Sequence, residues 1–236
     1  PLHRQKTLSI EMTEVLQSGA KMTEEILIAS ARLHNHFSPD TTFPQIDQHT
    51  DGFEELGAIL AKYNAHRHFR LRLLHRHTLI PKGQILLGAT TTEPPGFWTT
   101  PTPISDVDLQ QIHPHIISAD VINCSSEGDM GTGRLFPSEF REGQPSTFGN
   151  ISGNFFKEFI DCLRANKLEN TFGLEVVQGQ SGKMIEFSFN SGSLLLEEQE
   201  VKAEFRQDKA GQFKLQETGW TITVKDGTVC KTGETR

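Results

Sequence analysis

The chain has 236 residues, of which 35% are hydrophobic and 22% are charged, and its formal net charge is −7. This length suits one domain with a substantial core, so we expect a single globular domain over residues 1–236. An acidic chain is poorly suited to neutralising phosphates, and no apolar run reaches the roughly 20 residues needed to cross a bilayer. Composition therefore disfavours a nucleic-acid binder and a membrane protein, and leaves a small-molecule substrate as the expected partner.

The cysteines and the N-terminus indicate the compartment. Cys124, Cys162 and Cys230 are odd in number and far apart, which disfavours a disulfide framework. We therefore expect a reducing, cytoplasmic environment. Residues 1–6 lack an initiator Met and the apolar stretch of a signal peptide, so we interpret this end as a processed start.

Residues 8–64 are expected to be mostly helical. Two sets of apolar side chains recur at three- and four-residue steps, the spacing of one helix face. They are Met22, Ile26, Ala29, Leu33 and Phe37, followed by Phe53, Leu56, Leu60 and Tyr63. The first helix should end before Ser38-Pro39, because the residue before a proline is disfavoured in a helix. Asp51 and Glu54 have capping-box spacing, which predicts the start of the second helix.

The middle of the chain, residues 65–149, should combine a hairpin with long loops. Alternation with a period of two predicts strands over residues 66–79, 84–90 and 115–121. The first two should pair through a turn at 81–83. The Thr- and Pro-rich segment 91–103 is typical of a loop. The Gly-, Ser- and acid-rich segment 123–149 is typical of a mobile flap over a site.

The last part, residues 150–232, should contain one helix followed by short strands. The helix is predicted by Phe155, Phe156, Phe159, Ile160 and Leu163. The strands are predicted over residues 172–177, 184–189, 194–198, 201–205, 213–216 and 220–224. No crossover helix separates them, so we expect an antiparallel sheet. The fold class is therefore α+β: a meander-like or partly open barrel sheet with the N-terminal helices and one mid-chain helix packed on it.

Histidine spacing is the most unusual feature of the sequence. Ten histidines placed at random would give about 0.4 His-x-His pairs, and the chain has four. They are His34/His36, His66/His68, His75/His77 and His113/His115. Two imidazoles at i and i+2 point to the same face of a strand, whereas on a helix they diverge. The pairs in predicted strands are therefore the ones that can act together.

Alternation along residues 66–79 sorts the histidines by face. His75 and His77 share the parity of Phe69, Leu71 and Leu73, so they should point into the core. The other face should be solvated and carry His66, His68, Arg70, Arg72 and Arg76. The arginines on this face could bind an anionic substrate group bidentately, or simply pair with nearby acids.

Three interpretations of the inward pair His75 and His77 remain open. They could be two ligands of a divalent metal, Zn or Fe, with Asp120, Glu186 or His115 as the third ligand. They could instead be catalytic acid/base groups without a metal. The structural alternative is one imidazole hydrogen-bonded in the core and the other at a sheet edge.

The leading functional hypothesis is a small-molecule enzyme, of specialised metabolism, built around His75 and His77. The alternative is a non-catalytic binding or interaction module whose contact surface is the face with Arg70 and Arg72. The segment from Leu71 to His77, with the strand 84–87 after it, resembles a motif in uncharacterised fungal proteins. That resemblance marks the two histidines for attention and implies no reaction.

Overall fold

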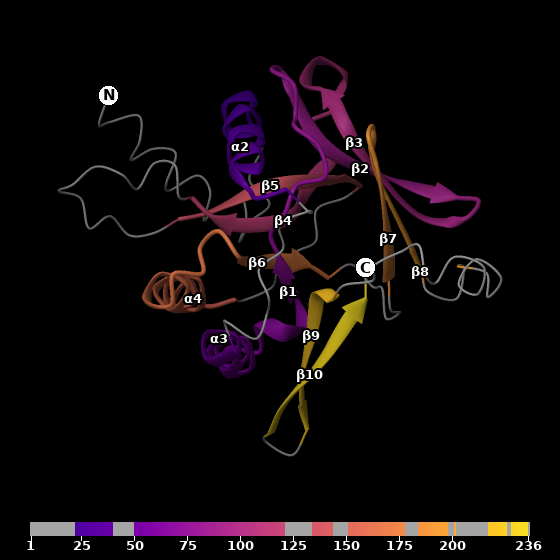
Figure 1. Ribbon diagram of the computed structural model, residues 1–236. Helices are drawn as coiled ribbons and strands as arrows, with labels where there is room; N and C mark the ends of the chain where they lie inside the picture. The colour runs from indigo at the N-terminus through magenta and orange to yellow at the C-terminus, as the bar shows by residue number, and fades with distance from the viewer. Residues whose placement is uncertain are drawn as a thin grey trace, which may run out of the picture.

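The computed structural model describes residues 22–39, 50–120, 134–143, 151–177, 184–197, 201, 217–225 and 228–235. Its α-helices are α2 (Glu24–His36), α3 (Thr50–Lys62) and α4 (Gly153–Ala165), and its short 3₁₀ helices are η3 (Ala65–Arg67) and η4 (Ile104–Asp106). The first five strands are β1 (Phe69–Leu73), β2 (Gln84–Thr92), β3 (Pro95–Pro103), β4 (Ile112–Ala119) and β5 (Leu135–Glu142). The other five are β6 (Phe172–Val176), β7 (Met184–Phe189), β8 (Gly192–Glu197), β9 (Glu217–Lys225) and β10 (Thr228–Thr235). Figure 1 shows their arrangement.

All ten strands of the described chain belong to one open sheet in the order β10-β9-β1-β6-β4-β5-β2-β3-β8-β7. Neighbouring strands are antiparallel except β2 and β5, which are parallel. The predicted combination of helices with a mostly antiparallel sheet is confirmed. The meander is wrong, because β1, β6 and β4 lie next to one another although they are far apart in the sequence.

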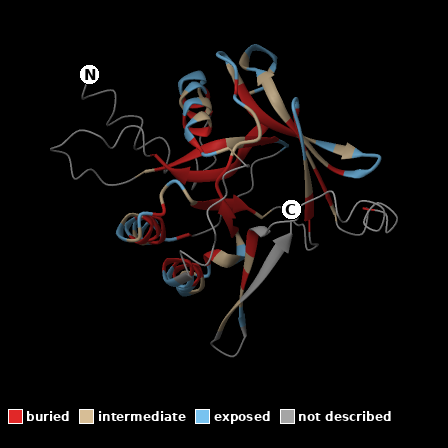
Figure 2. Cartoon of the chain, viewed as in Figure 1, coloured by how far each residue is buried: buried red, intermediate tan, exposed pale blue. Residues whose placement is uncertain are grey.

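Two apolar clusters attach the helices to the sheet. Helices α3 and α4 pack with β1, β6 and β9 in one cluster, and α2 packs with β2, β4 and β5 in the other. In Figure 1, α2 lies above β4 and β5, whereas α3 and α4 lie below them. Burial follows the same division, since in Figure 2 the helices are buried toward the sheet and exposed on their outer sides. No described helix has the length and apolarity required to span a membrane.

The three predicted helices are confirmed, with one correction at a helix start. Thr23 caps α2 by accepting a hydrogen bond from the Ile26 amide, and the helix stops one residue before Phe37. Helix α3 already includes Thr50, so Asp51 lies inside its first turn and is not the cap. An acidic side chain there still favours the helix, because it faces the positive end of the helix dipole.

The predicted 66–90 hairpin is wrong. Strand β1 ends at Leu73 and pairs with β6 and β9, whereas β2 pairs with β3 and β5. Two backbone amides of the intervening segment donate to the end of α2 instead: that of Arg76 to the Ser38 carbonyl, and that of Ile80 to Asn35 Oδ1. Because these groups are already satisfied, the segment does not return as a partner of β1.

Two segments predicted as loops contain strands. Residues 91–103 complete β2 and form β3, which pairs with β2 along its whole length. The segment 123–149 contains β5, while 123–133 and 144–149 lie outside the described residues. The predicted strand 213–216 also lies outside them, as does the predicted strand 201–205 apart from Val201, and the sequence does not predict β10. Pairing to neighbouring strands outweighs the low intrinsic strand preference of Pro and Gly here.

We predict that Phe155→Ala lowers the free energy of unfolding by about 3–5 kcal/mol, the usual cost of truncating a buried Phe. The ring is fully buried and contacts the rings of Tyr63, Phe69, Phe156 and Phe159, so its loss leaves a cavity. Urea denaturation measures the change. Ile28→Ala on the exposed side of α2 is the control and should change the value by less than about 0.5 kcal/mol. Equal effects of the two substitutions would contradict this assignment of the core.

Candidate functional site

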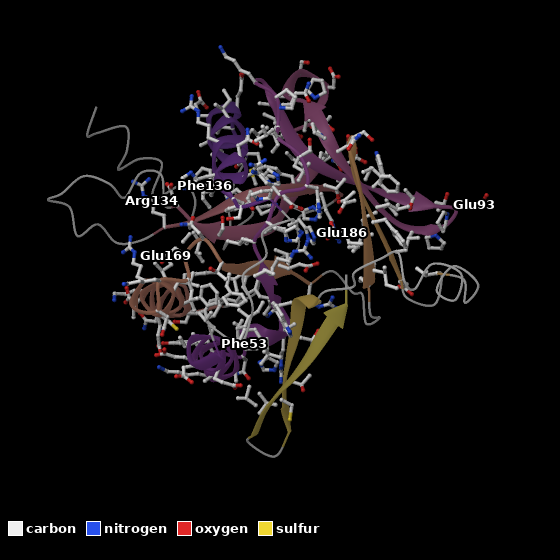
Figure 3. All side chains as sticks on the ribbon, in the orientation of Figure 1. Phe53, Glu93, Arg134, Phe136, Glu169 and Glu186 are labelled. Atoms are coloured by element: carbon white, nitrogen blue, oxygen red, sulfur yellow. The ribbon has the colours of Figure 1, made fainter. Side chains whose placement is uncertain are left out.

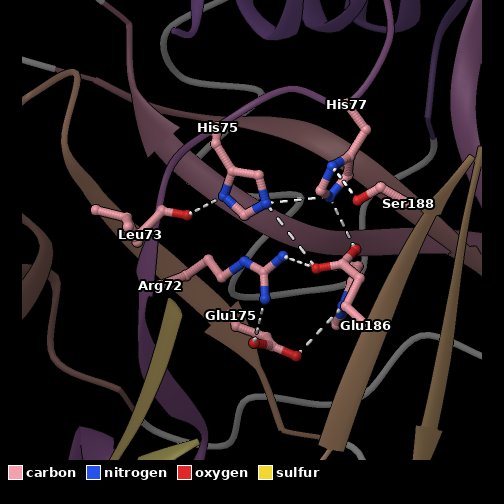
Figure 4. Close-up of polar contacts among 8 residues, drawn as sticks. Arg72, Leu73, His75, His77, Glu175, Glu186 and Ser188 are labelled. Atoms are coloured by element: carbon pink, nitrogen blue, oxygen red, sulfur yellow. Dashed lines mark hydrogen bonds and ion pairs between the residues drawn. The ribbon is translucent and has the colours of Figure 1, made fainter. Parts of the chain in front are cut away.

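The site begins with a contact between two strands that are far apart in the sheet order. Strand β7 is the last strand and β1 is the third, yet Arg72 Nη2 of β1 donates to Glu186 Oε2 of β7 over 3.0 Å. The sheet therefore curves until its β7 edge faces β1. Glu186 lies near the middle of the molecule in Figure 3, and the contact is drawn in Figure 4. Both side chains are nearly buried, at 5% and 9% exposure.

His75 and His77 reach the same place from the segment that follows β1. His75 is buried, and its Nδ1 lies 2.9 Å from the carbonyl oxygen of Leu73. Because a carbonyl only accepts hydrogen bonds, Nδ1 carries the proton and donates it. The Nε2 lone pair of His75 is thereby left facing His77 Nε2, 3.1 Å away (Figure 4).

His77 connects this pair to the carboxylate of Glu186. Its Nε2 lies 3.2 Å from Glu186 Oε1, and its Nδ1 lies 2.7 Å from Ser188 Oγ. His75 Nε2 lies 3.9 Å from Glu186 Oε2. Two imidazole nitrogens and a carboxylate thus converge on one point, an arrangement that requires either an N–H hydrogen on His77 Nε2 or a metal ion between them.

The spacing of these donors fits a bound divalent cation. Zinc binds imidazole nitrogen and carboxylate oxygen at about 2.0–2.2 Å, so two donors on adjacent corners of its coordination shell lie roughly 3–3.4 Å apart. The observed 3.1 and 3.2 Å separations match that range. Among the described residues, His75, His77 and Glu186 form the group whose ligand atoms all lie within 4.8 Å of one another.

A second layer of charged groups surrounds the three donors. Arg72 Nη1 lies 3.9 Å from Glu175 Oε2, and His115 Nε2 lies 3.5 Å from Glu175 Oε1. The side chains of Arg72, Glu175 and His115 are all about 95% buried. Glu139 of β5 also acts electrostatically on this cluster. We refer to Arg72, His75, His77, His115, Glu139, Glu175 and Glu186 together as the polar cluster.

Burial and neighbouring charge set the protonation of these groups. Burial, followed by the charges of Arg72 and His77, lowers the pKa of His75 to about 3, so its imidazole is neutral. Burial also opposes ionisation of Glu186, but Arg72 and His77 outweigh it and hold the pKa of that carboxyl well below its usual range. Burial raises the pKa of Glu139 to about 7 despite the opposing charge of Arg72. A neutral imidazole and an ionised carboxylate are the forms in which these side chains ligate metals.

The predicted side assignment along residues 66–79 is wrong, although His75 is buried as expected. Phe69, Leu71 and Leu73 belong to the apolar cluster of α3 and α4. His75 and His77 instead lie beside Glu186, which also pairs with Arg72. The alternation fails because β1 ends at Leu73, so a parity count carried beyond that residue has no strand to follow. His66 lies in η3 and His68 directly follows it, which removes them from any strand face.

The three arginines predicted to bind substrate, Arg70, Arg72 and Arg76, do not share one solvated face in the structure. Arg70 and Arg72 are buried rather than solvated, and Arg72 donates a hydrogen bond to Glu186. Arg76 donates from Nε to the carbonyl of Phe37, 2.8 Å away, which ties the segment to the end of α2. The predicted solvated arginine face is therefore wrong.

Of the three candidate third ligands, Glu186 lies beside the histidine pair. His115 belongs to the polar cluster through Glu175 but is not in the ligand group. Asp120 is buried at the end of β4, where its amide bonds to the Arg134 carbonyl, and it is also not in that group.

Sequence reasoning missed Glu139, Arg141 and Glu175. A signal existed for Glu175, which is a single acid within the apolar strand Phe172–Val176. Glu139 and Arg141 alternate with Ser138 and Phe140 in β5, but the Gly-rich composition around them is typical of a loop. A charged residue within an apolar strand needs a partner, and that need was the available clue.

Comparison with known proteins identifies no relative. No protein-family model matches the chain, and no curated protein or solved structure matches it. The resemblance of the Leu71–His77 segment to fungal proteins therefore stays a prediction, and any functional argument rests on the geometry of the polar cluster.

We predict that Arg72→Met lowers the free energy of unfolding by about 3–5 kcal/mol, because it leaves Glu186 charged and buried without its cation. The double variant Arg72→Met with Glu186→Gln should be more stable than the sum of the single effects predicts, by about 1–3 kcal/mol. Urea denaturation of all four proteins at pH 7 provides this thermodynamic cycle. Strictly additive effects would show that the two side chains do not interact.

We predict that the free energy of unfolding decreases as the pH falls below about 6.5, and that His34 contributes to this decrease. Burial, followed by the charge of His77, lowers the pKa of His34 from 6.5 to about 4. As pH falls through this window, the unfolded chain binds a proton that the folded chain does not, so stability decreases by up to about 1.4 kcal/mol per pH unit from this residue. His34→Leu should flatten the dependence between pH 6.5 and 5 in urea denaturation. His36→Leu, at an exposed position of α2, should leave it as steep as in the wild type.

Proposed function

We propose that His75, His77 and Glu186 bind a divalent metal ion, Zn or Fe, and that the protein is an enzyme acting on a small molecule at this centre. The observation that carries the proposal is the convergence of three donors with 3.1 and 3.2 Å spacings. Two histidines and one carboxylate occupy three coordination positions and leave others for water or substrate, which is the arrangement of catalytic rather than structural sites. A metal bound there would act as a Lewis acid toward substrate oxygen.

The groups around the donors support ligation. Leu73 fixes the protonated nitrogen of His75, Ser188 contacts the distal nitrogen of His77, and Arg72 orients Glu186. Such outer contacts commonly fix the orientation of ligating histidines and carboxylates. His75 and Glu186 are thereby held in the ionisation states that a metal needs, without a conformational change.

A metal-free proton-transfer enzyme is the second candidate, and Glu139 is the observation in its favour. A carboxyl group with a pKa raised to about 7 both donates and accepts protons near neutral pH. His75, whose pKa is lowered to about 3, is a poor base, so this candidate assigns proton transfer to Glu139 and leaves the two histidines to bind substrate.

An interaction module using an arginine surface has less support. Its contact residues Arg70 and Arg72 are 6% and 4% exposed, so neither presents its charge to a protein partner. The proposal therefore keeps a small molecule as substrate, with a role in specialised metabolism as the broader hypothesis.

The test is elemental analysis of the full chain, produced without a histidine tag and without added metal. We expect near-stoichiometric Zn or Fe in the wild type. The double variant His75→Ala/His77→Ala should lose it, and so should Glu186→Gln, because each removes donor atoms. The matched control is His66→Ala/His68→Ala, a second His-x-His pair outside the polar cluster, which should keep its metal.

Circular dichroism shows that each variant is folded before its metal content is compared. A wild type that neither contains metal nor takes up Zn²⁺ or Fe²⁺ in titration calorimetry would remove the metal proposal and favour proton transfer through Glu139. Metal that persists in the folded His75/His77 variant would place the site elsewhere.

A further inference from the structure

Arg141 of β5 carries a buried positive charge that the polar cluster does not neutralise by contact. The residue is 3% exposed. Within the described part of the chain, its guanidinium has no hydrogen bond or ion pair, and its buried Nε lacks a hydrogen-bond partner. Its close contact is with Phe97, whose ring centroid lies 3.8 Å from the guanidinium carbon. A buried cation without a paired anion is costly, so this position requires an explanation.

Strand register places Arg141 on the same sheet face as Glu186. Arg141 pairs with Gly88 of β2, and Gly88 pairs with Thr99 of β3, two residues from Phe97. Across β8 and β7, Phe97 lies in one cross-strand row with Leu195 and Glu186. Directly opposed residues point to the same face of a sheet, as do residues two apart in one strand. Arg141 and Glu186 thus face the same side.

Gly88 and Phe97 hold the arginine in place. A side chain at Gly88 would meet Arg141 Cγ at 3.3 Å, so the glycine leaves room for the stem of the arginine. The ring of Phe97 covers one face of the guanidinium, which leaves the N–H groups at its edge for an in-plane partner. A planar, bidentate acceptor is the natural complement of such an edge.

We propose that Arg141 binds the carboxylate of a small-molecule substrate and orients that substrate toward His75, His77 and Glu186. This assignment deepens the proposed function, on which it rests for the reacting end of the substrate. Binding of the carboxylate itself involves Arg141 and requires no metal. The two parts can therefore be tested separately.

The charges nearby favour a monoanion over a phosphate dianion. Arg72 contacts both Glu186 and Glu175, so its guanidinium is already occupied by two carboxylates of the protein. Arg141, whose buried Nε lacks a hydrogen-bond partner among the described residues, is the guanidinium left to contact one carboxylate. A second negative charge would lie within electrostatic range of Glu139, Glu175 and Glu186, which repel it.

The test is titration calorimetry of the EDTA-treated full chain with benzoate, and separately with inorganic phosphate. We expect benzoate to bind and phosphate to bind at least tenfold more weakly. Arg141→Met, which keeps the volume but removes the charge, should weaken benzoate binding by about tenfold or more. Arg32→Met, at an exposed position of α2, is the matched control and should bind benzoate as the wild type does.

Thermal unfolding without ligand separates this role from a structural one. Removing an unpaired buried charge should leave the melting temperature of Arg141→Met equal to or above that of the wild type. A lowered melting temperature together with unchanged benzoate binding would overturn the proposal, because the arginine would then serve the fold. Phosphate binding more tightly than benzoate would overturn the choice of a carboxylate. Both measurements are made without metal. Whether the wild type binds a metal ion therefore affects neither benzoate binding nor the melting temperature.

Discussion

The ion pair between Arg72 and Glu186 is the contact on which the site depends. It joins the third strand of the sheet order to the tenth, so it is made only when the sheet curves fully. Arg72 keeps Glu186 ionised against the effect of burial, and the ionised carboxylate in turn meets His77. Sheet curvature, ionisation of Glu186 and convergence of the three donors are therefore consequences of one another.

The charged groups of the polar cluster do not belong to the two apolar clusters that attach the helices to the sheet. The two large clusters that hold the helices on the sheet consist of apolar side chains, and the charged groups of the polar cluster lie apart from them. Burying several ionised groups together is costly even when they are paired. Local departures from the rules of stable packing are expected at functional sites, and this cluster of buried charges is such a departure.

The sequence predicted the helices and the most informative histidine pair because both depend on local spacing. Apolar side chains three and four residues apart define α2, α3 and α4 wherever the rest of the chain lies. Glu186 could be selected only as one of three candidates, since its strand is separated from His77 by more than a hundred residues. Glu139 and Arg141 were missed because β5 forms by pairing with β4 and β2, and its own composition resembles a loop.

By itself, the sequence determined the helical segments, the mixture of helices with an antiparallel sheet, and the two imidazoles next to each other in the chain. Only the tertiary structure decided which acid meets them, which arginine neutralises that acid and which arginine is left without a paired anion. The physical reason is that amphipathic spacing is a property of neighbouring residues, whereas strand order and sheet curvature arise from contacts between segments far apart in the chain.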